Sequence, residues 1–132
     1  GDNRFYNNIL IGDGASAGKD LAGRPGYGLW MYDGREFPLW TGGNVFYHGA
    51  RPYGRETNAV VSEEHNPQAT LRQQDGHFLL DLDLGSELKG ADTALVTTAV
   101  LGQAKIPGLA YENPDGSPLA VDKDYFGNRA IG

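Results

Sequence analysis

The residues best suited to recognition chemistry are aromatic side chains gathered between positions 30 and 53. Aromatic rings pack against the C–H faces of sugars, and nearby polar side chains hydrogen-bond the sugar hydroxyls. Arg55 follows closely and would supply part of a polar rim. The alternative is that the rings fill a small core; we favour that for Trp40, which follows Pro38-Leu39, and leave it open for Trp30 and Tyr32. The candidate carbohydrate-binding residues are Trp30, Tyr32, Trp40, Tyr47, Tyr53 and Arg55.

Carboxylates are the second group of residues suited to chemistry, because hydrolysis of a glycosidic bond generally uses two of them. Asp81 and Asp83 lie two positions apart, so on a strand they would share a face with Cα atoms about 6–7 Å apart. The same alternation is expected on the solvent side of a hairpin, and we favour that interpretation. Glu63 and Glu64 are adjacent and would point to opposite faces of a strand. The sequence therefore assigns no catalytic residue.

Three histidines raise the question of a metal. His48, His65 and His77 lack the short spacings that are typical of zinc sites. A fold could still bring them together with Glu64 or Asp75, so a small metal-dependent enzyme remains an alternative. The sequence itself assigns no metal ligand and predicts no cofactor.

Composition narrows the classes of partner. The chain has 132 residues, a formal net charge of −6 and no cluster of basic residues, which argues against binding to nucleic acid. No apolar run approaches the length of a membrane span, so no membrane partner is expected. There is no cysteine, and glycine contributes 20 residues, which predicts many tight turns and few long helices.

The elements that must position these residues begin with two similar phrases. Asn8 precedes Ile9-Leu10-Ile11, and 36 residues later Asn44 precedes Val45-Phe46-Tyr47. Short apolar runs bounded by turn residues are typical of buried strands, and stacked asparagines form ladders in β-helices. Because 36 residues exceed an ordinary coil, a loop must intervene, and the Gly-rich residues 13–26 would form it.

The remaining segments predict further strands and turns. Residues 27–34 alternate as a strand, with Leu29 and Met31 on one face. Asp75-Gly76 joins residues 69–74 to 77–84 as a hairpin with one wet face. Residues 86–90 predict a helical turn, and residues 94–101 predict another strand. Turns follow at Pro107-Gly108 and at residues 113–118.

Several phrases resemble the C-terminal region of secreted bacterial right-handed parallel β-helix proteins that act on plant polysaccharides. The similar segments are Asp2 to Ile9, Gly43 to Phe46 with Gly49-Ala50-Arg51-Pro52, Tyr111 to Pro118, and the closing Asp124-Tyr125-Phe126-Gly127-Asn128-Arg129. Within that group the chain looks most like the β-helix β-xylosidases, which are retaining glycoside hydrolases. The resemblance implies secretion, to the medium or to the bacterial periplasm, and a catalytic carboxylate pair in coils upstream of this region.

The resulting expectation is an all-β chain that forms one domain over residues 1–132 of a larger parent protein. Terminal coils of a right-handed parallel β-helix, with a Gly-rich loop, would occupy residues 1–55. A hairpin and terminal strands would occupy residues 56–132. The expected role is the scaffold and subsite region of a xylan-acting glycoside hydrolase, with a stand-alone carbohydrate-binding module as the alternative. An exposed coil edge would favour a homodimer.

Overall fold

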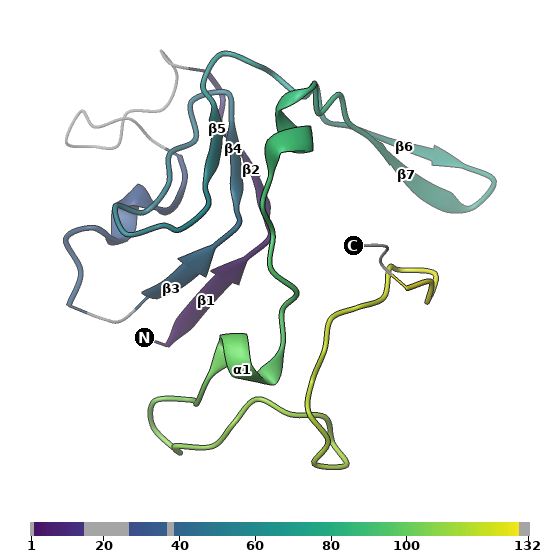
Figure 1. The fold of residues 1–132 in the computed structure, drawn as a ribbon. Coiled ribbons are helices and arrows are strands. Elements are labelled where there is room, and N and C mark those ends of the chain that lie inside the picture. Colours follow the sequence, from purple (N-terminus) through teal and green to yellow (C-terminus); the bar gives the residue numbers. More distant parts are fainter. Residues whose placement is uncertain (1, 15–26, 37–38, 130–132) are drawn as a thin grey trace.

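The computed structural model describes residues 2–14, 27–36 and 39–129. The regular elements are mostly short strands, with little helix, and long irregular segments join them (Figure 1); this confirms the all-β prediction at that level. The described elements, in chain order, are β1 (Asn3–Tyr6), β2 (Ile9–Ile11), η1 (Leu29–Tyr32), β3 (Leu39–Gly42), β4 (Val45–Tyr47), β5 (Val60–Ser62), β6 (Thr70–Gln74), β7 (His77–Asp81), η2 (Glu87–Gly90) and α1 (Thr98–Leu101). No helix in these ranges is long and apolar enough to cross a membrane.

The N-terminal part is built from parallel strands stacked level upon level. β1 pairs with β3 so that Asn3 faces Leu39, and β2 pairs with β4 so that Ile9 faces Val45. Both pairings join residues 36 positions apart, as the two similar phrases predicted. The Gly-rich loop expected between them falls largely on residues 15–26, outside the described residues.

β5 adds a third level that the sequence reading did not anticipate. It lies parallel to β4, with Val60 beside Val45, so the stack continues past residue 55 (Figure 1). The described sheets are small: β1 pairs with β3, and β2, β4 and β5 follow one another in a separate sheet. These sheets do not close on one another through strand pairing.

Asn44 joins the levels of the stack from inside. Its side chain is fully buried, and its Oδ1 accepts hydrogen bonds from the backbone N and the Nδ2 of Asn8, both at 2.9 Å. Its Nδ2 donates to the Phe5 carbonyl at 2.8 Å and to Glu56 Oε1 at 2.6 Å. The predicted asparagine ladder is therefore present, since a buried amide is stable only when both of its ends are paired.

The core of the described part is small. Leu29, Phe46 and Ala50 form its buried centre, and partly buried side chains pack around it: Phe5, Leu10, Tyr32 and Tyr53. The rings of Phe5 and Tyr32 meet at a centroid distance of 6.0 Å. Aromatic residues thus supply much of the bulk in a part of the chain rich in glycine.

The Asp75-Gly76 hairpin is confirmed. β6 and β7 pair antiparallel, and both turn residues have positive φ, 50° for Asp75 and 81° for Gly76, as a two-residue hairpin turn requires. The hairpin projects from the stacked strands (Figure 1). The prediction of a single wet face is wrong, because every residue of both strands is exposed.

Two predicted strands are wrong. Residues 29–32 form a short 3₁₀ helix, because Gly28 enters with φ 111° and the Leu29 N–H is taken by the Arg51 carbonyl. Residues 98–101 form a helical turn, because the Thr97 hydroxyl accepts a hydrogen bond from the Val100 N–H as a helix cap does. At residues 29–32 a long-range backbone hydrogen bond, and at residues 98–101 a local cap, overrides the β preference of the side chains.

Beyond β7, the described chain forms helical turns and isolated bridges in place of the expected terminal strands. One bridge joins Thr97 to Ala120 and another joins Glu112 to Pro118. The helical turn predicted at residues 86–90 is present as η2, and the predicted turns at 107–108 and 113–118 are also present.

Arg4 connects β1 to this C-terminal segment. Its guanidinium donates to the carbonyls of Leu101 at 2.6 Å and Gln103 at 2.8 Å, and it pairs with the Asp2 carboxylate. The same guanidinium lies 4.2 Å from the centre of the Trp40 ring and 4.7 Å from that of Tyr111. A nearly buried cation is thereby satisfied by carbonyls, a carboxylate and two aromatic rings.

Candidate carbohydrate-binding site

The candidate site lies where η1 meets the segment that follows β4. Gly28 forms a parallel bridge with Arg51, the Leu29 N–H donates to the Arg51 carbonyl at 2.9 Å, and the Arg51 N–H donates to the Tyr27 carbonyl at 3.0 Å. A Cβ at position 28 would lie 2.2 Å from the Arg51 carbonyl oxygen. Only glycine allows this close approach, which sets η1 beside residues 50–52.

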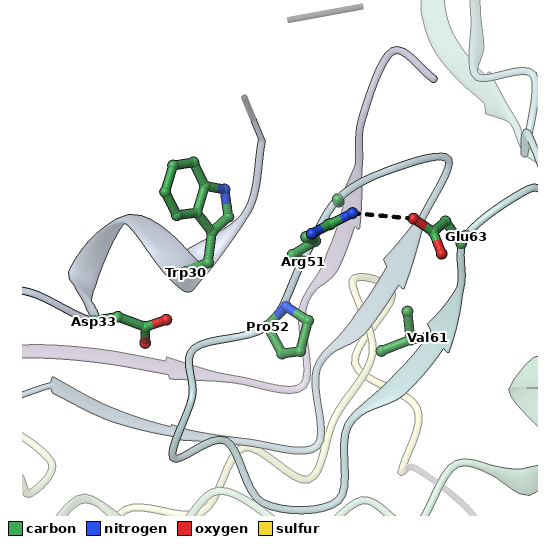
Figure 2. A pocket seen from close by; sticks show the side chains of 7 residues that line it. Trp30, Asp33, Arg51, Pro52, Val61 and Glu63 are labelled. Atoms are coloured by element: carbon green, nitrogen blue, oxygen red, sulfur yellow. Dashed lines mark hydrogen bonds and ion pairs between the residues drawn. The ribbon is translucent and has the colours of Figure 1, made fainter. Parts of the chain in front are cut away.

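The first pocket opens between η1, this segment and β5 (Figure 2). Its volume is about 580 Å³, within the range of small-ligand sites. The side chains come from three separate parts of the chain, so no short sequence motif could have predicted the pocket. Its lining residues are Trp30, Asp33, Ala50, Arg51, Pro52, Val61 and Glu63.

The first pocket is lined by side chains of positive and of negative charge. Arg51 donates to Glu63 at 3.3 Å across the pocket, and both side chains are about half exposed (Figure 2). Asp33 accepts a 2.7 Å hydrogen bond from the Gly54 N–H, which fixes its carboxylate at one end. An exposed ion pair of this kind adds little stability, so these groups can exchange partners with a polar ligand at little cost.

A second pocket of about 500 Å³ adjoins the first and shares Asp33 with it. Aromatic and charged side chains dominate its wall. The lining residues are Tyr6, Asp33, Arg35, Glu36, Leu39, Trp40, Thr41, Tyr53 and Arg55.

The six predicted binding residues are divided by the structure. Trp30 lines the first pocket, while Trp40, Tyr53 and Arg55 line the second. Tyr32 lines neither pocket and packs its half-buried ring on the core. These placements leave the binding role of the pocket-lining residues a prediction.

Tyr47 has no face available to a ligand. Its side chain is fully buried, its hydroxyl donates to the Leu84 carbonyl at 2.7 Å, and its ring packs against that of His65. Burial raises the pKa of the Tyr47 phenol above its usual value. Its place in the candidate binding set is therefore corrected to a core residue.

Trp40, for which the sequence favours a core position, has both a structural contact and a place in a pocket wall. It is half-buried and stacks on the Arg4 guanidinium at 4.2 Å, as a structural residue would. It also contributes to the wall of the second pocket.

The three histidines and the two aspartates do not meet at one place in the described part of the chain. The described residues contain no group of three or more His, Asp or Glu side chains that could hold a metal, so the three histidines do not converge. His65 bonds the Asp83 carbonyl and His77 lies in the hairpin. Asp81 forms an exposed ion pair with Arg72 on that hairpin, and β7 ends before Asp83.

Sequence reasoning missed the residues that complete the first pocket. In the sequence, Asp33 before Gly34 predicts a turn cap, and Glu63 was set aside because Glu64 would point to the opposite face. Arg51 was noted only as part of a family-like phrase. Without the parallel pairing of β4 with β5, nothing in the sequence brings Glu63 to Arg51.

Comparison with known proteins gives a fold relationship. No protein-family model matches the chain, and no curated protein matches it. Among solved structures, that of XylC in complex with xylose superposes with a TM-score of 0.81 at 24% sequence identity, over 99% of this chain and 23% of that one. The chain thus shares the fold of a part of XylC and spans less than a quarter of its length.

Proposed function

We propose that this chain is the sugar-binding and scaffold region of a larger xylan-acting protein. In this proposal the parent is a secreted glycoside hydrolase built on a right-handed parallel β-helix, and the described strands are its last coils. The ligand class is a xylose-based oligosaccharide from plant cell walls. The region binds the sugar and completes the scaffold.

The observation that carries the proposal is the pocket around Trp30. An indole beside an Arg–Glu pair and an anchored aspartate is the combination that neutral sugars require: an apolar face with donors and acceptors at its edge. A carboxylate accepts hydrogen bonds from sugar hydroxyls and a guanidinium donates to them. One pocket can therefore hydrogen-bond the hydroxyls on both edges of a pyranose ring.

The choice of xylose rests on two further supports. XylC, whose fold this chain shares over 99% of its length, was solved with xylose bound. The phrases at Asn8, Asn44 and residues 124–129 independently resemble β-helix proteins that act on plant polysaccharides. A stand-alone binding module would use the same pocket.

Calorimetric titration of the 132-residue chain with xylo-, cello- and manno-oligosaccharides tests the proposal. We expect saturable binding of the xylose series. Trp30→Ala should weaken this binding about tenfold, because one aromatic contact contributes about 1.4 kcal/mol.

The matched control is Tyr125→Ala, which removes an aromatic ring that is 97% exposed and lies outside both pockets. It should leave the affinity unchanged. Absence of binding by every xylo-oligosaccharide, or equal loss in both variants, would contradict the proposal.

A further inference from the structure

The two pockets adjoin at Asp33, which lines both. Each pocket takes part of its wall from residues 30–36 and part from residues 50–55. Trp30 with Arg51 lines the first pocket, and Arg35 with Arg55 lines the second, so both segments pass from the first pocket to the second. Asp33 belongs to both pockets and is held to Gly54 at 2.7 Å, which places it at their junction.

The second pocket carries unused hydrogen-bonding capacity. Within the described ranges, the guanidinium groups of Arg35 and Arg55 have no hydrogen-bond or ion-pair partner. Thr41, which is 9% exposed, also lines this pocket, and its buried hydroxyl has no partner among the described residues. The two guanidinium groups are exposed, so a ligand rich in hydroxyl groups would accept hydrogen bonds from them in place of water.

The charges of the second pocket favour a neutral ligand over an anionic one. Two guanidinium groups are matched by two carboxylates, those of Asp33 and Glu36. Trp40 and Tyr53 add aromatic surface to the same wall. An acidic sugar would gain from the arginines but would also approach both carboxylates, so no net attraction is expected.

From this arrangement we propose that the two pockets form one groove, which binds a linear oligosaccharide through at least two consecutive sugar residues, one beside Trp30 and the next beside Tyr53 and Arg55. The inference rests on the proposed function and extends it by assigning consecutive units of the oligosaccharide to the two pockets. Asp33, at the junction, would accept hydrogen bonds from hydroxyls of both units.

Calorimetric titration with xylose, xylobiose and xylotriose measures this coupling directly. We expect xylobiose to bind about tenfold more tightly than xylose, as one additional filled subsite would give. Arg55→Ala should remove most of that gain, so that xylose and xylobiose bind with nearly equal affinity. Arg55 is exposed, so its replacement does not disturb the core.

Two further variants test whether the gain with chain length depends on the second pocket. Arg72→Ala removes an exposed arginine from the distant hairpin and should retain the full gain with chain length. Tyr53→Phe keeps the ring that packs on the core but removes the hydroxyl, and should lose part of the gain.

The two tryptophans give an independent readout. In a Trp30→Phe variant, Trp40 is the remaining tryptophan, and it lines the second pocket. Xylobiose should change its fluorescence at saturation, whereas xylose should change it little.

The outcomes separate the two proposals. Equal affinity for xylose and xylobiose, with Arg55→Ala and Arg72→Ala indistinguishable, would overturn the two-unit groove while leaving the sugar pocket at Trp30 intact. Failure of every xylo-sugar to bind would remove the proposed function as well.

Discussion

At the scale of single residues, Asn44 joins the levels of the stack through four side-chain hydrogen bonds. One buried amide joins Asn8, the Phe5 carbonyl and Glu56, and so connects two levels of the stack to the segment before the third. A hydrophobic residue of the same size could not replace it, because its side chain could neither accept from the Asn8 N–H nor donate to the Phe5 carbonyl.

We expect Asn44→Ala to lower the free energy of unfolding by about 3 kcal/mol, since it leaves several buried groups without partners. Urea unfolding followed by circular dichroism measures this. Asn3→Ala is the matched control: Asn3 is exposed at the start of β1, so the change should stay within about 0.5 kcal/mol. Equal effects of the two substitutions would contradict a structural role for the ladder.

The aromatic residues differ in which neighbouring groups cover the faces of their rings. Tyr47 is enclosed, Trp40 has one face on Arg4, and Trp30 stands at the mouth of the first pocket. Residue type alone does not separate these cases, because an amphipathic ring is equally suited to a core and to a sugar platform. The neighbouring segments decide between them.

At the scale of elements, β1 and the segment around residues 101–111 are held together by Asp2 and Arg4. Asp2 Oδ2 accepts the Lys105 N–H at 2.7 Å, and its other oxygen pairs with Arg4. The Lys105 backbone hydrogen bond, assisted by the Arg4 side chain, lowers the pKa of Asp2 below its ordinary value of 3.8. This contact ties the beginning of the chain to a segment about a hundred residues later.

A pH dependence follows with a definite sign. Because the pKa of Asp2 is lowered in the folded state, its contribution to stability is present above pH 3.8 and is lost as the pH falls through the folded value. We expect Asp2→Asn to melt at a lower temperature than the wild type near neutral pH. The two melting temperatures should converge under acid conditions, as thermal scans across this range can measure.

The control for this experiment is Asp75→Asn, at the hairpin turn. Asparagine tolerates the positive φ of that position, so the substitution removes a similar charge with little strain. Its effect should not reproduce the convergence. A constant difference between Asp2→Asn and wild type down to strongly acid pH would contradict the assignment.

At the scale of the whole molecule, the projecting hairpin carries the most conspicuous exposed apolar surface. Leu71, Phe78 and Leu80 share one face of β6 and β7, and they are 65%, 69% and 60% exposed. A two-stranded ribbon is marginal by itself in water, and contiguous exposed apolar surface promotes self-association.

We expect Phe78→Lys to lower the binding of a hydrophobic dye and to reduce self-association, because it breaks this apolar face with a charge. Dye fluorescence and light scattering at matched concentrations measure both effects. Gln73→Lys adds the same charge opposite Phe78 on the same face without removing apolar area, and should have the smaller effect. Equal responses would show that charge alone is responsible.

The sequence alone determined features that depend on near neighbours or on a repeated phrase. The hairpin follows from Asp75-Gly76, whose residues accept the positive φ that the turn demands. The pairing of β2 with β4 follows from the echo of Asn8 at Asn44, because stacked levels repeat the same apolar pattern. Each of these signals can be recognised in a short stretch of sequence. This holds even for the repeated phrase, which pairs strands that lie 36 residues apart.

Only the tertiary structure decided the first pocket. Residues 27–34 alternate as a strand would, yet the close approach of Gly28 to Arg51 turns residues 29–32 into a 3₁₀ helix and sets Trp30 beside Arg51. Glu63 joins them because β5 stacks on β4, a pairing without a sequence echo. A site assembled from three segments depends on long-range backbone contacts, and these are properties of the folded chain.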